Sequence, residues 1–392
     1  MGLPEFFQFH VPTKIIFGEG VASDFSIELE EMGVGKPLIV TDKVIEKLGL
    51  VEYVVKGLKE NGVEIGGIFN EVPQDSSVSV VNKIAELYKK NDCDGFIAIG
   101  GGSVIDSVKG ANIVAGAGGD LIKDHSGAQT LIHPLKPLIA IPTTAGTGSE
   151  VTTAALIYNE KTQIKMEFID RFLPASLAVL DPNMTKTLPP KITAATGMDA
   201  LTHAIEAFVD VDATPLSDMY AEEAMCIIVS HLVNACTNGE DVEERGWMML
   251  GATIAGAAFS HSECGVVHGI AHSLGGLLRI PHGVANAIIL PFGMEYNLPV
   301  REERFSKIAK IFGVYEDNLS PLENGRRAIQ YIKSLKEKLK EVAGLPTKLR
   351  EVGVSEKDFP EIIEKTLVDG TSIYNPREET EEGVLEILKN AF

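Results

Sequence analysis

The stretch GFIAIGGGSVIDSVKG, residues 95–110, decides the fold class of the chain. Its first part is an apolar run typical of a buried strand, and its last part has the pattern of a helix. Three glycines, residues 100–102, join the two parts. A strand that passes through a tight turn directly into a helix is the repeating unit of parallel α/β proteins. We predict that Ser103 and Asp106 form a capping box, so that Ser103 begins the helix.

The same alternation recurs on both sides of this stretch. Strand-like runs end in polar residues at PLIVTD, residues 37–42, and at PLIAIPTT, residues 137–144. Residues 78–90 have a helical pattern, and the run ASLAVLDP, which ends at Pro182, is the last strand-like segment. The sequence therefore predicts an α/β dinucleotide-binding domain with a parallel sheet over residues 1–184.

From residue 185 onward the apolar residues recur with a helical period, which predicts an all-helical domain over residues 185–392. Two domains also agree with the length, because 392 residues exceed one ordinary hydrophobic core. Ligands of parallel α/β proteins commonly bind at the carboxyl ends of the strands. We therefore expect a ligand site in the cleft between the two domains.

The composition is that of an acidic globular protein. A formal net charge of -20 argues against a nucleic-acid or anionic-membrane partner, since both repel an acidic surface. The N-terminus has no signal-peptide pattern, and four scattered cysteines without a Cys-x-x-Cys pair indicate reduced thiols in a cytoplasmic protein. The mixed-charge run LKEKLKE, residues 335–341, is predicted to be a solvated helix face.

Two loops of the first domain are candidates for binding a dinucleotide. Glycines at residues 100–102 let the backbone approach a phosphate at a helix N-terminus, although a tight turn without a ligand has the same sequence. The loop PTTAGTGSEVT, residues 142–152, offers five hydroxyl residues to phosphate or ribose oxygens. Asp42 ends a strand, where a carboxylate can bind ribose hydroxyls and repel a 2′-phosphate. Spacing alone favours the simpler alternative, in which Asp42 caps the next helix.

Histidines of the second domain indicate a metal site. Asp199 and His203 lie four residues apart and therefore share one helix face, and His268 and His272 repeat that spacing. A third histidine, His282, follows in the same apolar, glycine-rich sequence. Buried histidines need partners for both ring nitrogens, and a shared divalent ion would satisfy this set together.

The distance between the outer histidines requires a break in the helix. In one straight helix His268 and His282 would lie about 21 Å apart, too far to bind one ion. Gly275, Gly276 and Pro281 predict a break that brings His282 back. The spacing leaves open whether His272 or His282 completes the metal site.

Several motifs together resemble the iron-containing (group III) alcohol dehydrogenase family over essentially the whole chain. They are GGGSVIDSVKG, PTTAGTGSE, DPNMTKTLPPKITAATGMDALTHAIEA, GVVHGIAHSLGG, IPHGVANAIILP and, at residues 374–380, YNPREET. The resemblance implies that the metal and the nicotinamide meet in the interdomain cleft. It implies that His272 is a non-ligand histidine between the metal and the nicotinamide. It implies four metal ligands, which are Asp199, His203, His268 and His282.

The resemblance also assigns cofactor and substrate contacts. Asp42 stands at the position linked to a preference for NAD over NADP, and Phe259 lines the substrate end of the cleft. The implied dinucleotide contacts are Asp42, Gly101, Gly102, Ser103, Thr143, Thr144, Thr147, Thr152 and Lys165.

The chain departs from the family pattern at three places. VPQDSS, residues 72–77, replaces Val-x-Pro-Asn-Pro, and Val104 replaces a common proline. Both changes lie on the cofactor side and bear on the choice between NAD and NADP. His261 stands where asparagine is common, and two roles stay open for it: it reshapes the substrate pocket, or it supplies another nitrogen near the metal.

The function that the resemblance implies is a metal-dependent, NAD(P)-linked alcohol dehydrogenase or aldehyde reductase. An ion, Fe²⁺ or equally well Zn²⁺ by ligand type, polarises the oxygen of a small primary alcohol or its aldehyde. Hydride passes between the carbinol carbon and nicotinamide C4, and we assign proton release to His272 and the ribose hydroxyls. We also expect the protein to be a cytoplasmic homodimer without a nucleic-acid or membrane partner.

Two alternatives remain. A glycerol-dehydrogenase-like or dehydroquinate-synthase-like enzyme shares the architecture, but an enzyme that grips a phosphate needs a basic cluster beside the metal. The metal motifs carry few basic residues, chiefly Lys191 and Arg279. The other alternative is a non-catalytic metal- or nucleotide-binding protein. The evidence against it is the presence of the complete ligand set, His272 and Lys165.

Overall fold

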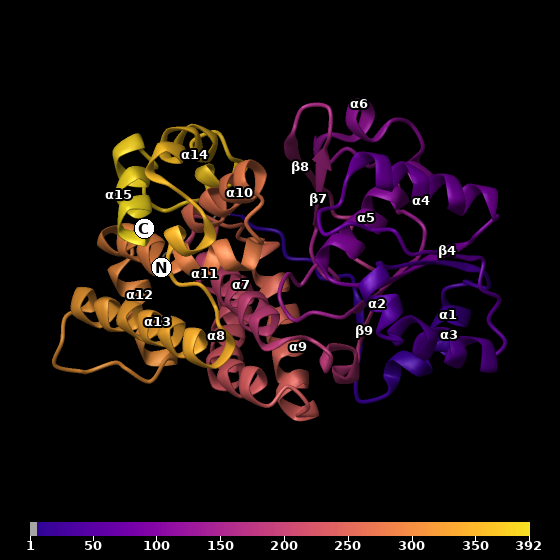
Figure 1. Ribbon diagram of the computed structural model, residues 1–392, viewed down its shortest axis with the longest axis horizontal. Coiled ribbons are helices and arrows are strands. Elements are labelled where there is room, and N and C mark those ends of the chain that lie inside the picture. Colours follow the sequence, from indigo (N-terminus) through magenta and orange to yellow (C-terminus); the bar gives the residue numbers. More distant parts are fainter. Residues whose placement is uncertain (1–5) are drawn as a thin grey trace. The chain divides into compact units, whose positions relative to one another are not determined.

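The computed structural model describes residues 6–392 and divides into two compact units (Figure 1). The α/β unit comprises His10–Thr187 and residues 240–249. The helical unit comprises Leu188–Gly239, residues 250–392 and the described residues before His10. Each unit has its own secondary-structure class, as the change of period along the sequence predicts.

The α/β unit is built on a six-stranded sheet in which all pairs of neighbouring strands are parallel. The strands lie in the order β1-β9-β6-β4-β2-β3. Their bounds are Lys14–Phe17 for β1, Pro37–Val40 for β2, Gly67–Phe69 for β3, Gly95–Gly100 for β4, Leu138–Pro142 for β6 and Leu177–Leu180 for β9. The predicted parallel sheet and its last strand are confirmed.

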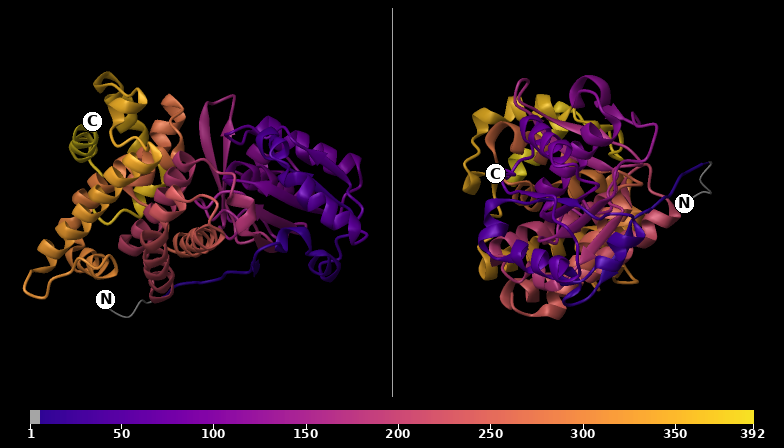
Figure 2. Two further views of the ribbon diagram at one scale, coloured as in Figure 1. Left: turned by 60° about the horizontal axis from the view of Figure 1, so that its bottom comes forward. Right: turned by 90° about the vertical axis from the view of Figure 1, so that its right-hand side faces the viewer.

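Helices cover both faces of this sheet (Figure 2). Alternate residues of β4 point to opposite faces, so that Phe96 packs in one apolar core and Ile97 in the other. The first core includes residues of α4 and α5, and the second includes residues of α1 and α3. Burial on both faces explains why the strands are apolar throughout. The helices are α1 (Ser26–Glu31), α2 (Lys43–Lys47), α3 (Leu50–Glu60), α4 (Val78–Lys90), α5 (Gly102–Asn112) and α6 (Leu121–His125).

The predicted capping box at the start of α5 is wrong. The helix begins one residue earlier, and its N-cap is Gly101, which has no side chain to cap with. The hydroxyl of Ser103 donates to the carbonyl of Gln74. The carboxylate of Asp106 accepts from Ser149 Oγ at 2.7 Å.

A second, three-stranded sheet was not predicted. Its strands are β5 (Gly127–Ala128), β7 (Ala154–Asn159) and β8 (Ile164–Ile169), in the order β5-β8-β7. β7 and β8 form an antiparallel hairpin, and the residues of β7 alternate between buried and half-buried. This hairpin carries Lys165.

The helical unit contains no strand among the described residues, which confirms the prediction of an all-helical second half. The helix α7 is buried over almost its whole length and packs against α8 and α11, while α10 packs against α11 and α14. Among the described residues, no helix combines the length and the apolar character needed to cross a membrane. The helices are α7 (Pro190–Val209), α8 (Pro215–Thr237), α10 (Val266–Leu278), α11 (His282–Asn297), α12 (Glu302–Ile311), α13 (Pro321–Ala343), α14 (Phe359–Thr366), α15 (Glu381–Ala391) and, from residue 250 onward, α9 (Val242–Phe259), whose residues 242–249 belong to the α/β unit.

The break between α10 and α11 lies later than the glycines suggested. Gly275 and Gly276 are inside α10, and the chain turns at Arg279, whose φ of 57° is left-handed. Pro281 is the N-cap of α11, so that His282 is the first residue of that helix. The predicted break is confirmed at Pro281 but is wrong at the glycines, because the helix tolerates them in its last turns.

The predicted solvated face at residues 335–341 is wrong at one position. Lys336 is 4% exposed, and its Nζ donates to the carbonyl of Ile288 in α11 at 2.8 Å. Pro291 lies inside α11 and interrupts the hydrogen-bond ladder of that helix near this carbonyl. Burial lowers the pKa of Lys336 to about 7. The lysine therefore stabilises a weakened stretch of a neighbouring helix.

Candidate metal centre

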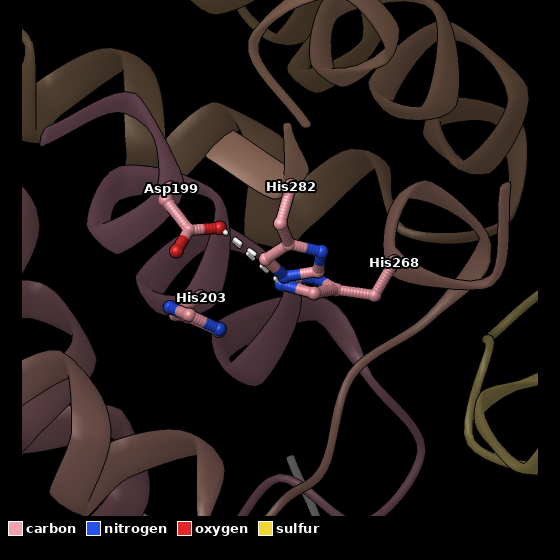
Figure 3. Close-up of side chains that lie close together, drawn as sticks. All are labelled: Asp199, His203, His268 and His282. Atoms are coloured by element: carbon pink, nitrogen blue, oxygen red, sulfur yellow. Dashed lines mark ion pairs between the residues drawn. The ribbon is translucent and has the colours of Figure 1, made fainter. Parts of the chain in front are cut away.

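Four side chains from three helices of the helical unit converge, as Figure 3 shows. Asp199 and His203 lie one turn apart on α7, His268 is on α10, and His282 begins α11. One potential ligand atom of each side chain lies within 4.8 Å of the others. His282 Nε2 is 3.5 Å from Asp199 Oδ1 and is the most open member, with 30% of its side chain exposed.

A close approach between two helices positions His282. A Cβ atom on the next residue, Gly283, would lie 2.4 Å from the carbonyl oxygen of Ala195 in α7. Only glycine allows the start of α11 to approach α7 this closely. The glycine thus brings His282 to the helix that carries Asp199 and His203.

Glu206 orients the ring of His268. The Oε2 atom of Glu206 lies 2.5 Å from His268 Nδ1, and the carboxylate also accepts from the backbone N–H of Val267 at 2.8 Å. Burial lowers the pKa of His268 to about 3, so its imidazole is neutral, and burial raises the pKa of Glu206 to about 7. With its proton on Nδ1, His268 turns the lone pair of Nε2 toward Asp199, as a metal ligand requires.

Asn286, one turn after His282 on α11, lies among the ligand atoms. Its Nδ2 is 2.6 Å from Asp199 Oδ1, 3.1 Å from His268 Nε2 and 3.2 Å from His282 Nε2. Its Oδ1 is buried and has no hydrogen-bond partner among the described residues. One NH₂ group is thus shared by three acceptor atoms, which are Asp199 Oδ1, His268 Nε2 and His282 Nε2. A carboxylate oxygen and imidazole nitrogens are also suitable ligands for a divalent cation.

Aromatic stacking connects Phe259 to the cluster. The ring of His203 stacks on Phe259 with centroids 4.2 Å apart and on His268 with centroids 4.5 Å apart. His261 lies in the loop after α9, where its Nδ1 bonds the carbonyl of Ala257 at 2.8 Å and its ring stacks on Phe9. Phe259 thus contacts the cluster, whereas His261 is not one of its four members.

His272 lies beside the cluster but is not one of its four members. Its ring stacks on His282 with centroids 5.4 Å apart, and its Nδ1 lies 3.1 Å from Asp369 Oδ2. Of the two histidines that spacing left open, the structure brings His282 to Asp199, His203 and His268.

The candidate cofactor residues of the α/β unit gather at one edge of the sheet. β2, β4 and β6 are parallel neighbours, so the loops that follow their carboxyl ends lie side by side. A Cβ atom on Gly101 would lie 3.1 Å from Thr144 Oγ1, and one on Gly102 would lie 2.7 Å from Thr147 Cγ2. The hydroxyl of Thr143 is buried without a hydrogen-bond partner among the described residues. The structure thus brings the glycine turn and the threonine loop together.

The remaining candidates have partners within the protein. Asp42 caps α2 by accepting from the backbone N–H of Val44 at 2.7 Å, which confirms the simpler interpretation of its position. Ser103 bonds the Gln74 carbonyl, as described above. Lys165 Nζ lies 3.7 Å from Asp75 Oδ1.

Thr152 is held by a lysine that the sequence analysis missed. The fully buried Lys109 of α5 donates from Nζ to Thr152 Oγ1 at 2.9 Å and to the carbonyls of Thr152 and Ala154 at 2.8 Å. Burial lowers the pKa of Lys109 to about 8. One turn earlier, Asp106 binds Ser149 in the same loop. The spacing of Asp106 and Lys109 on one helix face is the signal that could have identified this contact.

Some of the other residues that the sequence analysis missed have a signal in the sequence, and one has none. Glu206 follows His203 by three residues and Asn286 follows His282 by four, so each shares a helix face with a predicted ligand. Asp369 is 97 residues from His272, and no spacing rule connects them.

Comparisons with known proteins identify the family of the chain. Residues 12–182 match the family model for iron-containing alcohol dehydrogenase, and residues 193–392 match the model for the C-terminal part of the Fe-containing alcohol dehydrogenase family. An NAD-dependent methanol dehydrogenase of Bacillus methanolicus is 37% identical over 98% of this chain and 99% of its own. A 1,3-propanediol dehydrogenase of Citrobacter freundii is 38% identical with the same coverage.

A solved structure has the same fold. The crystal structure of a 1,3-propanediol oxidoreductase superposes with a TM-score of 0.95 at 37% sequence identity. The match covers 99% of this chain and 100% of that one. The chain therefore belongs to the iron-containing alcohol dehydrogenase family and is a metal-dependent oxidoreductase of alcohols and aldehydes.

Proposed function

We propose that the helical unit binds one divalent ion, Fe²⁺ with Zn²⁺ as the alternative, and that the enzyme couples a small primary alcohol and its aldehyde to NAD. The proposed ligands are Asp199, His203, His268 and His282. The observation that carries the proposal is their convergence, with all four ligand atoms within 4.8 Å of one another. When bound, the ion supplies Lewis acidity toward the substrate oxygen.

The environment of the four side chains supports metal binding over a structural role. Asp199 and His268 are 4% and 3% exposed at their side chains, and burial keeps His268 neutral, so a cation at this place would compensate the charge of the buried Asp199 carboxylate. One carboxylate and three imidazoles leave a divalent ion with a net charge of about +1. That charge suits a neutral substrate oxygen.

NAD is proposed to bind at the edge formed by the loops after β2, β4 and β6. Thr143 supports this, because its buried hydroxyl has no protein partner among the described residues and can bond a ligand. The backbone at Gly101 and Gly102 begins α5, where unpaired N–H groups favour a phosphate. Asp42 uses only Oδ1 in its two capping bonds, and we propose that the carboxylate also disfavours the 2′-phosphate of NADP.

Two further roles are proposed beside the metal ligands. His272 transfers a proton during the reaction, together with the ribose hydroxyls, because it is an imidazole next to the cluster. Phe259 borders the substrate site because it stacks on His203, and His261 shapes the same region from the adjoining loop.

The substrate class rests on the relatives and on charge. Those named above act on methanol and on 1,3-propanediol, both small and uncharged. We propose a small alcohol or aldehyde of the same kind for this enzyme. A homodimer, a cytoplasmic location and the placement of metal and nicotinamide between residues 1–184 and 185–392 stay predictions from the family resemblance.

The test is an activity and metal assay on protein purified without oxygen. Its metal content is measured, and oxidation of NADH and NADPH is followed with short aldehydes before chelation, after chelation, and after return of Fe²⁺ or Zn²⁺. We expect activity with NADH that is lost on chelation and restored best by one ion. Activity that survives complete metal removal, or activity on phosphorylated substrates only, would contradict the proposal.

A further inference from the structure

The threonine loop, residues 142–152, lies beside the glycine turn, but no regular secondary structure holds it there. From Thr143 onward it belongs to no helix or strand until β7 begins at Ala154. It packs closely on the start of α5, since a Cβ atom on Gly102 would lie 2.7 Å from Thr147 Cγ2. The position of the loop therefore depends on individual contacts with its surroundings.

Lys109 of α5 makes three of these contacts with one nitrogen. Its Nζ donates to Thr152 Oγ1 at 2.9 Å and to the carbonyls of Thr152 and Ala154 at 2.8 Å. An ammonium group has three N–H donors, and these three acceptors match it in number. Lys109 and Thr152 are 0% and 3% exposed, so water competes little for the contact. The lysine thus attaches the end of the loop and the first residue of β7 to α5.

Asp106 makes the adjoining contacts one turn earlier on the same face of α5. Its Oδ1 accepts from Ser149 Oγ at 2.7 Å, and its Oδ2 accepts from the backbone N–H of Leu156 in β7 at 3.2 Å. Ser149 belongs to the middle of the threonine loop. Together, Asp106 and Lys109 therefore hold both the loop and the beginning of β7.

Attachment of β7 also positions Lys165. β7 pairs with β8 in an antiparallel hairpin, in which Tyr158 lies opposite Lys165. The same helix, α5, begins at the glycine turn. One helix thus connects three parts of the proposed cofactor site, which are the glycine turn, the threonine loop and the hairpin that carries Lys165.

We propose that Lys109 is a positioning residue for the dinucleotide: together with Asp106 it keeps the threonine loop and the β7–β8 hairpin in the arrangement that binds the cofactor. This inference rests on the proposed NAD site. The three donors of Lys109 are used within the protein, so the lysine acts through the loop and not by touching the cofactor. Its contribution is to cofactor affinity and not to the chemical step.

The variant Lys109→Met tests this role, because it keeps an unbranched apolar side chain and removes all three donors. Without them the loop is free to leave the binding arrangement. The apparent affinity then falls in proportion to the fraction of molecules that retain that arrangement. We expect the Kd of NADH to rise about tenfold or more, which corresponds to about a tenth of the molecules or fewer.

Binding is measured by the fluorescence of NADH titrated with metal-free protein, and hydrogen exchange of residues 142–156 is followed in parallel. Lys336→Met is the matched control, because Lys336 is also a buried lysine that donates to a backbone carbonyl, but in the helical unit. We expect weaker NADH binding and faster exchange in Lys109→Met only. Wild-type Kd in Lys109→Met overturns the inference, and so does an equal rise of Kd in Lys336→Met.

Kinetics of the metal-loaded proteins separate positioning from a general loss of structure. In Lys109→Met the KM of NADH should rise, while kcat at saturating NADH and the KM of the aldehyde should stay within about twofold of the wild type. A general loss of structure would lower kcat as well. A lower kcat with an unchanged KM of NADH would overturn the inference.

The design distinguishes this inference from the proposed function. If the wild type binds neither NADH nor NADPH, the proposed function fails and the cofactor role of Lys109 fails with it. If the wild type binds NADH and Lys109→Met binds it equally well, only this inference fails. If Lys109→Met does not fold, Ser149→Ala removes the contact with Asp106 and should raise the Kd of NADH by a smaller factor; an unchanged Kd would overturn the inference.

Discussion

The variant Glu206→Gln tests whether the hydrogen-bond partner of His268, a proposed metal ligand, sets metal affinity. Glu206 accepts hydrogen bonds on both carboxylate oxygens. Oε1 accepts from the Val267 N–H at 2.8 Å, and Oε2 accepts from the His268 backbone at 3.3 Å and from His268 Nδ1 at 2.5 Å. Glutamine has the same shape but only one acceptor oxygen, so it can satisfy one side of this arrangement and not both.

The size of the effect depends on which of these hydrogen bonds the glutamine loses. If the amide oxygen faces His268, the NH₂ group opposes the Val267 N–H, and leaving that buried donor unsatisfied costs about 1–3 kcal/mol of folding free energy. If the NH₂ group faces His268, the ring loses its acceptor and its tautomer is no longer fixed. Loss of such a partner lowers metal affinity by about 10- to 100-fold. We therefore expect Glu206→Gln to lose either free energy of unfolding or metal affinity, depending on which way the amide faces.

The assay is competition for Zn²⁺ against a chromophoric chelator, with unfolding of the metal-free protein measured in parallel. Asp170→Asn is the matched control, because Asp170 is buried in the α/β unit and accepts from the backbone of Leu131 and Phe172. The control should lose comparable stability and bind Zn²⁺ like the wild type. Glu206→Gln protein that binds Zn²⁺ within about twofold of the wild type and also keeps the wild-type free energy of unfolding would refute the reasoning, since each orientation of the amide loses one of the two.

Four further predictions use other parts of the chain. Because the pKa of Lys336 is about 7 in the folded protein and that of an unperturbed lysine is 10.5, the unfolded chain binds more protons between those values. Denaturation should thus show wild-type stability rising with pH there, by at most about 1.4 kcal/mol per unit, and Lys336→Met should lack that rise. Thermal unfolding should show Gly283→Ala destabilised by about 1–3 kcal/mol through its clash with α7, whereas Gly276→Ala, with nothing within 4 Å, should gain up to about 1 kcal/mol. Asp42→Ser keeps the helix cap but removes the charge, so the ratio of kcat/KM for NADPH to that for NADH should rise about tenfold or more. Chelation should lower hydrogen-exchange protection in α7, α10 and α11 and leave the parallel sheet protected.

Local patterns explain what the sequence predicts well. The run Gly95–Gly100 is apolar because both faces of the sheet are covered, and the glycines after it permit the turn that the structure contains. Asp199 and His203 lie on one face of α7 because four residues make about one helical turn. Such features depend on neighbours within a few residues, which is why spacing alone identifies them.

Other residues, such as Lys336 and Asp369, could not be predicted because their partners lie far along the chain. Lys336 looks like a surface lysine in a charged run, but its partner Ile288 lies 48 residues earlier, in a helix interrupted by Pro291. Asp369 has no sequence signal because tertiary packing alone brings it to His272. Such burial and pairing depend on which helices pack against each other. The periodicity of apolar residues within one helix does not show which helix that is.

The acids of α7 show why the metal is expected at one place on that helix. Asp199, Glu206 and Asp210 are all buried, and each carboxylate needs its charge removed or compensated. Asp210 has no hydrogen-bond partner for either oxygen among the described residues, and burial raises its pKa well above the usual value, which favours the uncharged form. Glu206 accepts two backbone N–H groups and His268. Asp199 accepts from the Asn286 amide at 2.6 Å and faces ring nitrogens of His268 and His282. Of the three carboxylates it is the one that lies among candidate metal ligands from three helices, which is why the proposed ion is placed beside it.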